Sequence, residues 1–138
     1  MSTEPLRHAL NGPTMGTRWS ALFFTAADVD VAPLQAALQA AVAEVDIQMS
    51  SWKPDSDLMR INRAPVGEWI DAPVRLIDVL RLGLEIGRAS GGAFDVCMGD
   101  AVTAWGFGPE AATGERIRIA LAAPRTPSWE AIDIADGR

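Results

Sequence analysis

The stretch SGGAFDVCMGDAVTAWGFG, residues 90–108, decides how the rest of the chain is interpreted. It combines tightly spaced glycines with an acid, Asp95, directly behind an aromatic residue, Phe94, and it closes on Trp-Gly-Phe-Gly. Glycine lets the backbone approach other groups closely, and paired glycines mark turns. We therefore expect an irregular loop that is held in place by its neighbours, which is where binding sites tend to lie.

The length and composition indicate one globular domain. The chain has 138 residues, of which 49% are hydrophobic and 22% are charged. A chain of this size buries roughly two thirds of its unfolded surface, which is enough for a core without disulfides or metals. The composition is that of an ordinary soluble domain and excludes the disordered and fibrous classes.

Charge and cysteine content exclude several kinds of partner and site. The formal net charge is −6 and no basic run offsets it, since Arg60 with Arg63 and Arg116 with Arg118 are only pairs, so nucleic acid and anionic membranes are poor partners. The single cysteine, Cys97, excludes an internal disulfide and a thiolate metal cluster. We find no stretch long enough to span a membrane and no apolar signal core, so the sequence predicts a cytoplasmic protein.

The N-terminal half contains one expected strand and one expected helix. Residues 1–13 are polar and contain proline and glycine, so we expect a flexible lead. The run TRWSALFFT, residues 17–25, is rich in aromatic and β-favouring residues and predicts a strand. From Pro33 to Met49, apolar residues recur at helical spacing behind a proline that suits a first helical turn.

Prolines and glycines divide the middle of the chain. Pro54 ends the first long helix. Asp55 and Ser56 offer N-cap oxygens for a short helix through Ile61, with Asn62 as its terminator. Residues 67–71 alternate in polarity and predict a short strand. Pro73 opens a second long helix that runs to the glycines after Ser90. Gly83 and Gly87 share one face of this helix, where another element is expected to pack closely.

The C-terminal part is less regular. Residues 114–123 fit either a strand or a helix, and residues 129–136 predict a strand. An uncovered edge strand at the end of the sequence is unusual in native domains, which leads us to expect an incomplete domain.

Common catalytic chemistries find little support. His8 is the only histidine and lies in the expected flexible lead, so a triad built on it would lack an anchored base. Zinc would lack imidazole and thiolate ligands. Cys97, between Val96 and Met98, is interpreted as a small buried hydrophobic residue rather than a nucleophile. The sequence contains neither a P-loop nor a Rossmann glycine pattern.

Two side chains remain as binding candidates, each with an ordinary structural alternative. Trp52 lies at the polar break between helices, where it could stack on a planar ligand or cover the end of the preceding helix. Asp95 is a carboxylate among apolar residues, and burying such a charge costs free energy unless the carboxylate is hydrogen-bonded or binds a ligand. It could accept backbone N–H groups in the glycine turn, which we favour, or it could bind a ligand.

Together these motifs resemble the ApbE-type flavin transferases, the FAD:protein FMN transferases. The resemblance rests on their order along the chain: TMGT at 14–17, MSSWKPDS at 49–56, IN at 61–62, SGGAFD at 90–95 and WGFG at 105–108. It covers residues 14–138 as the N-terminal portion, under half, of a typical family domain. One departure is Trp52, where the family usually has tyrosine.

The resemblance implies an α+β fold with an antiparallel or mixed sheet packed by two long helices, and a site for FAD. It implies magnesium-dependent transfer of FMN from FAD to a threonine of a target flavoprotein, with release of AMP. The flavin-contacting positions carried over are Met15, Trp52, Ala93, Phe94 and Asp95. The resemblance assigns no catalytic residue, and the magnesium ligands are expected in the part of the family domain that this chain lacks. Family members are often exported or membrane-anchored.

Three functions follow from these patterns. The first is an FAD:protein FMN transferase, or the N-terminal portion of one. The second is a truncated, non-catalytic FAD-binding module, which could form a homodimer. The third is a domain fragment that binds nothing.

Overall fold

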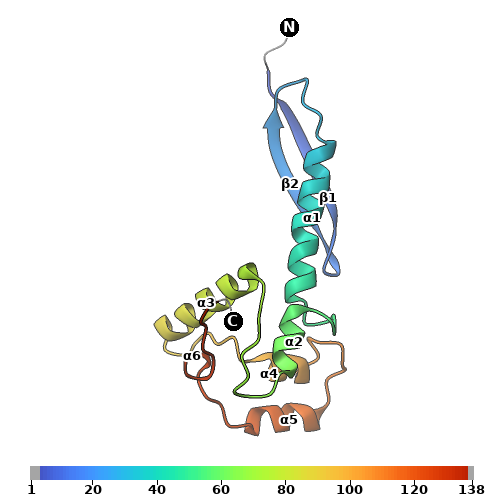
Figure 1. Cartoon of the computed structure of the whole chain (residues 1–138). Helices are drawn as coiled ribbons and strands as arrows, with labels where there is room; N and C mark the ends of the chain where they lie inside the picture. The colour runs from blue at the N-terminus through green and yellow to red at the C-terminus, as the bar shows by residue number, and fades with distance from the viewer. Residues whose placement is uncertain (1–3, 137–138) are drawn as a thin grey trace. The chain divides into compact units, whose positions relative to one another are not determined.

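The computed structural model of this chain describes residues 4–136. Two strands come first, and helices follow (Figure 1): β1 (Leu6–Thr14), β2 (Thr17–Thr25), α1 (Ala32–Met49), α2 (Asp57–Arg63), α3 (Val74–Ala89), α4 (Gly99–Ala104), α5 (Gly114–Ala122) and α6 (Ser128–Ala131). The strands pair antiparallel, which confirms the predicted α+β class. The chain divides into two compact units, one up to Ser50 and one from Ser51 onward, and each is described by itself.

The first unit begins with a tight β-hairpin. β1 and β2 pair without a break from Leu6 opposite Thr25 to Thr14 opposite Thr17. The two turn residues, Met15 and Gly16, have φ angles of 42° and 72°. Positive φ at both positions is what the preferred two-residue hairpin turn requires, because its backbone twist matches that of the strands. The predicted strand 17–25 is confirmed at both ends.

The expected flexible lead is wrong for most of its length. Residues 6–13 belong to β1, and residues 1–3 lie outside the described part of the chain. His8 is accordingly anchored: its ring stacks on Phe23 with centroids 5.4 Å apart, and its Nε2 lies 2.8 Å from the hydroxyl oxygen of Thr25. The polar composition of this segment gave no sign of a strand, because the strand is stabilised by pairing with β2.

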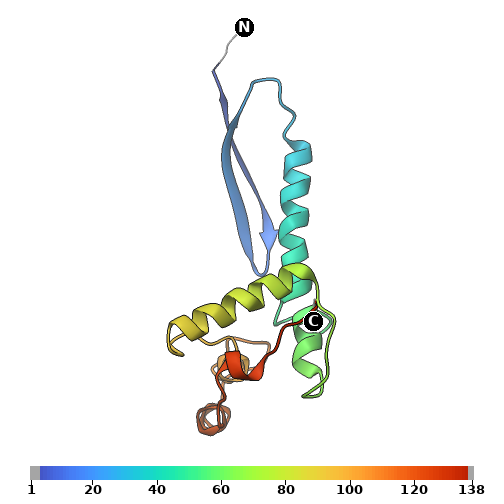
Figure 2. The ribbon, with the colours of Figure 1, turned by 60° about the vertical axis from the view of Figure 1, so that its left-hand side comes forward.

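Helix α1 packs along the hairpin in both views (Figures 1 and 2). Its side chains reach the strands through two glutamines. Gln39 accepts a hydrogen bond from the indole N–H of Trp19 at 2.9 Å and donates to the Pro13 carbonyl at 3.1 Å. Gln35 donates to the Asn11 carbonyl at 2.9 Å. The predicted helix from Pro33 to Met49 is confirmed, beginning one residue earlier at Ala32.

The second unit is built around α3, which packs against α6. The two glycines on one face of α3 admit other side chains to the helix backbone. A Cβ atom added at Gly83 would lie 2.5 Å from Cγ1 of Val96, and one added at Gly87 would lie 3.1 Å from the Trp129 ring. The close approach that the sequence predicted at Gly83 and Gly87 is therefore confirmed. α4 packs on α5 through Ala101, Ala104 and Ala120.

Several local predictions need correction. Residues 67–71 are irregular, and the predicted strand 129–136 is instead the short helix α6 followed by irregular chain. Alternating polarity favours extended backbone, but a ladder needs a partner strand, and residues 4–136 supply none to either segment. Residues 114–122 resolve to a helix, whose first turn is capped by the Thr113 hydroxyl. Helix α2 has the predicted Ser56 cap but continues past Asn62 to Arg63.

The Gly83 contact predicts the effect of a single added methyl group. We expect Gly83→Ala to destabilise the second unit by about 1–2 kcal/mol, because overpacking against Val96 outweighs the better helix propensity of alanine. Urea unfolding followed by circular dichroism measures the change. Gly114→Ala is the matched control, since no atom lies within 4 Å of the added Cβ there.

A double-mutant cycle with Val96 tests whether this contact causes the loss of stability. In a Val96→Ala background, Gly83→Ala should no longer destabilise, because the methyl group it meets has been removed. Equal destabilisation in both backgrounds would show that the Val96 contact is not the cause.

Candidate functional site

The loop that follows α3 is closed by its own backbone. Gly91 and Gly92 have φ angles of 60° and 87°, and the Gly92 N–H bonds the carbonyl of Gly87 at 3.0 Å. The Ala93 N–H bonds the carbonyl of Ser90 at 3.4 Å, and the Phe94 N–H bonds the Ser90 hydroxyl at 3.1 Å. These N–H groups are therefore committed within the loop.

Asp95 connects this loop to a distant part of the second unit. Its Oδ1 accepts the backbone N–H of Cys97 at 2.7 Å, and its Oδ2 accepts the backbone N–H of Ser128 at 3.0 Å. The Ser128 bond is the main cause that holds the pKa of the Asp95 carboxyl below its usual value, against the opposing effect of burial. Asp95 thus accepts backbone N–H groups, but from Cys97 and Ser128 rather than from the glycine turn that the sequence favoured.

Arg125 holds the other side of the same turn. Its guanidinium makes a bidentate pair with Asp100 at 3.0 and 3.1 Å. The same group donates to the carbonyls of Cys97 at 3.3 Å and Ala120 at 3.0 Å. Its hydrogen bond to Asp100 is the main reason that the pKa of the Asp100 carboxyl lies below its usual value. Sequence reasoning missed Arg125, since nothing local marks it.

Cys97 differs from its prediction. It was expected to be a small buried residue, but it is exposed. Loss of water around the sulfur, followed by the nearby Asp95 charge, raises the pKa of the Cys97 thiol. A raised pKa leaves less thiolate at neutral pH, which does not favour a nucleophilic role for this cysteine.

The five predicted contact residues fall into both units. Ala93, Phe94 and Asp95 are contiguous on the second unit's loop, and Trp52 lies in the turn before α2 of the same unit. Met15 occupies the hairpin turn of the first unit. Their large side chains are accessible, with 62% of Trp52, 54% of Met15 and 45% of Phe94 exposed. Met15 is also strained, because a positive φ is uncommon for a residue with a side chain.

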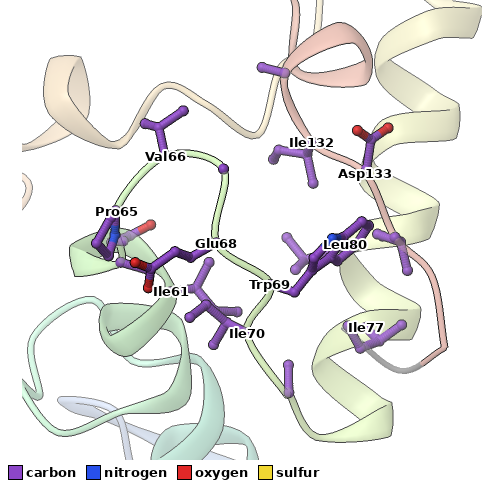
Figure 3. A pocket seen from close by; sticks show the side chains of 16 residues that line it. Ile61, Pro65, Val66, Glu68, Trp69, Ile70, Ile77, Leu80, Ile132 and Asp133 are labelled. Carbon is purple, nitrogen blue, oxygen red and sulfur yellow. The ribbon is translucent and has the colours of Figure 1, made fainter.

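A separate groove lies elsewhere in the second unit (Figure 3). It has a volume of about 490 Å³ and an apolar lining that includes Ile61, Trp69, Ile70, Ile77, Leu80 and Ile132. Figure 3 shows Trp69 beside Leu80, with Ile61 and Pro65 across from them. Its charged lining residues are Glu68 and Asp133, so it suits apolar or cationic groups better than phosphates. None of the five predicted residues lines it.

Metal and membrane features were tested over residues 4–136. In that range no three histidine, cysteine, aspartate or glutamate side chains are grouped as a metal site would need. Over the same residues, no helix has the length and hydrophobicity needed to cross a bilayer.

Comparisons with known proteins give one consistent result. Residues 15–138 match the family described as the ApbE family. The FAD:protein FMN transferase of Klebsiella pneumoniae is 36% identical over 120 residues, which is 85% of this chain and 34% of that protein. The Vibrio cholerae FAD:protein FMN transferase is 34% identical over 103 residues, which is 74% of this chain and 31% of that protein.

Solved structures agree with the sequence relatives. The flavin transferase ApbE from Vibrio cholerae matches 97% of this chain with a TM-score of 0.84 and 28% identity, over 44% of its own length. The Pseudomonas stutzeri flavinyl transferase ApbE matches 96% with a TM-score of 0.81 and 26% identity, over 43% of its length. The chain therefore spans about a third of the curated relatives and under half of these solved chains.

The bonds of Asp95 predict a pH-dependent contribution to stability. We expect Asp95→Asn to lower the free energy of unfolding by about 2 kcal/mol at pH 7, because an amide cannot accept both N–H groups as a carboxylate does. The folded-state pKa is depressed, so this contribution is present above the unfolded pKa of about 3.9 and is lost as pH falls through the folded value. Urea unfolding of both proteins at pH 7 and pH 3 measures it.

Asp133→Asn serves as the control, since Asp133 makes neither of these bonds. A wild-type advantage over Asp95→Asn that is the same at pH 3 as at pH 7 would contradict the proposed role of the carboxylate charge.

Proposed function

Because the chain belongs to the ApbE family, we propose that it is the FAD-binding N-terminal portion of an FAD:protein FMN transferase. The carrying observation is the family match over residues 15–138, joined to a hydrogen-bonded glycine loop that presents a half-exposed Phe94. The named relatives support the reaction class, since they are FAD:protein FMN transferases.

In this proposal FAD is bound mainly by aromatic and soft side chains. Trp52 stacks on the isoalloxazine ring, and Met15 contributes a polarizable thioether contact. Phe94 adds a further apolar surface, and Ala93 permits close approach at an exposed position of the loop. Asp95 keeps additional lone pairs on both oxygens beyond its two backbone bonds, so it can still accept from a ligand hydroxyl or amine.

The proposed reaction joins FMN to a threonine of a flavoprotein acceptor. The threonine oxygen forms a bond to the FMN phosphorus, and the bond from that phosphorus to the bridging oxygen breaks. AMP leaves with the electron pair, and the hydroxyl proton passes to a base. Residues 4–136 contain no group of three histidine, cysteine, aspartate or glutamate side chains placed to hold a metal ion, so no step is assigned to the metal here. We propose that its ligands lie in family segments outside the matched part.

A non-catalytic FAD-binding module is the second candidate. It is the alternative in which the same side chains bind FAD and no FMN is transferred. Both candidates require FAD binding, and they differ only in turnover.

FAD binding tests the first step. Isothermal titration calorimetry of FAD should show about ten-fold weaker binding for Trp52→Ala and a smaller loss for Trp52→Phe, because stacking contributes about 0.5–1.5 kcal/mol and phenylalanine retains part of it. Trp69→Ala is a matched control, since Trp69 is similarly exposed and lines the separate groove. Equal loss at Trp69 and Trp52 would place the flavin elsewhere or show a general effect on folding.

Turnover separates the two candidates. The protein is incubated with FAD, Mg²⁺ and a flavoprotein acceptor, alone and with the remaining part of a longer relative added in trans. Covalent flavin on the acceptor, seen as in-gel fluorescence, together with equimolar AMP supports the transferase portion. FAD binding without AMP in both arms supports the binding module, and no FAD binding at all overturns both.

A further inference from the structure

In the turn that follows Asp95, both backbone groups of Cys97 are hydrogen-bonded to side chains. The Cys97 N–H is bonded by Asp95, and the Cys97 carbonyl is bonded by Arg125. Arg125 lies in the connection between α5 and α6, 28 residues further along the chain. Ser128, in the same part of the chain, donates its N–H to Asp95. Two independent attachments therefore fix the 95–97 turn to the 125–128 segment.

The geometry at Arg125 uses the shape of the guanidinium. Its two terminal nitrogens bond both oxygens of Asp100 and, in addition, the carbonyls of Cys97 and Ala120. A planar fork makes all four bonds at once, which a lysine ammonium on a flexible stem cannot reproduce. One side chain thus joins the Cys97 turn, the start of α4 and the end of α5.

The ion pair between Arg125 and Asp100 is expected to position the turn more than it stabilises the whole unit. Arg125 and Asp100 are both partly exposed, and ion pairs of this kind add little to the stability of a fold. Among the described residues of this unit, the buried apolar ones are Leu76, Ile77, Ala101, Ala104 and Ala120, and neither Arg125 nor Asp100 is one of them. Loss of the Arg125 side chain should therefore loosen the turn before it unfolds the unit.

We propose that Arg125 is a positioning residue for the FAD-binding loop, acting through the Cys97 carbonyl and Asp100 to hold the Ala93–Asp95 trio in its binding geometry. This inference rests on the proposed function for its consequence in FAD binding. It makes Arg125 act through other residues and assigns it no contact with FAD.

Hydrogen exchange tests the positioning itself, without any ligand. In Arg125→Gln, the amide of Cys97 should exchange about ten-fold faster than in the wild type, because local opening of the turn becomes easier while α3 amides stay unchanged. Arg81→Gln is the matched control, since Arg81 forms an exposed pair with Asp78 at 3.2 Å on α3. An unchanged Cys97 amide in Arg125→Gln overturns the inference.

FAD affinity tests the consequence. Calorimetry should show about ten-fold weaker FAD binding for Arg125→Gln, with Arg125→Lys closer to Gln than to the wild type and Arg81→Gln unchanged. The melting temperature of Arg125→Gln should stay within a few degrees of the wild type. Wild-type affinity in Arg125→Gln, or a loss that simply follows unfolding, overturns the inference.

Cys97 gives a further readout because it is the chain's single cysteine and it is exposed. Saturating FAD should slow alkylation of Cys97 by iodoacetamide in the wild type, and the same FAD concentration should protect Arg125→Gln far less. If the wild type binds no FAD, the proposed function fails, whereas the exchange experiment still decides whether Arg125 holds the turn.

Discussion

The carboxylate of Asp95 accepts two backbone N–H groups that are far apart in sequence, and the loop geometry depends on this. One comes from Cys97 in its own turn and the other from Ser128 at the start of α6. A charged acceptor strengthens both bonds, and the depressed pKa keeps that charge in place at neutral pH. Without these bonds, a loop rich in glycine would pay a large entropic cost to hold one conformation.

The same loop can form only because α3 presents bare backbone on the side it covers. The face of α3 at Gly83 and Gly87 receives Val96 and Trp129, and the carbonyl of Phe94 also lies close to Gly87. Packing at these glycines places apolar groups on either side of Asp95, and the hydrogen bonds of Asp95 then satisfy the polar groups that this packing partly removes from water. The packing and the polar bonds therefore support one another.

Local sequence signals identified the elements that are stable through their own pattern. Strand 17–25, the helix from Pro33 and the Ser56 cap were all predicted, because side-chain periodicity and capping act within a few residues. The strand at Leu6–Thr14 was not, since its stability comes from pairing with β2. Residues 67–71 and 129–136 failed in the opposite sense: their strand-like alternation has no partner within the described residues.

In the candidate site too, the features set by neighbouring residues could be predicted and those set by distant residues could not. The Ala93–Asp95 trio could be singled out because its glycines and its acid are neighbours in the sequence. The bonds from Ser128 and Arg125 span 33 and 28 residues, so they exist only once the second unit has folded. The exposure of Cys97 was not predicted either, because the flanking residues Val96 and Met98 suggested burial.

The charges of this loop bear on how binding and chemistry would be divided in the proposed transferase. FAD carries two phosphates, and phosphoryl transfer needs positive charge to neutralise the transferring group. Three charged side chains make the hydrogen bonds around the 95–97 turn: Asp95, Asp100 and Arg125. The one cation among these three is Arg125, which is already paired with Asp100. Such a loop can select a flavin by shape and aromatic contact but adds no net positive charge at the phosphates. On this basis we propose that recognition of the flavin and neutralisation of its phosphates are separate tasks, and that the loop of Ala93–Asp95 is suited to the first.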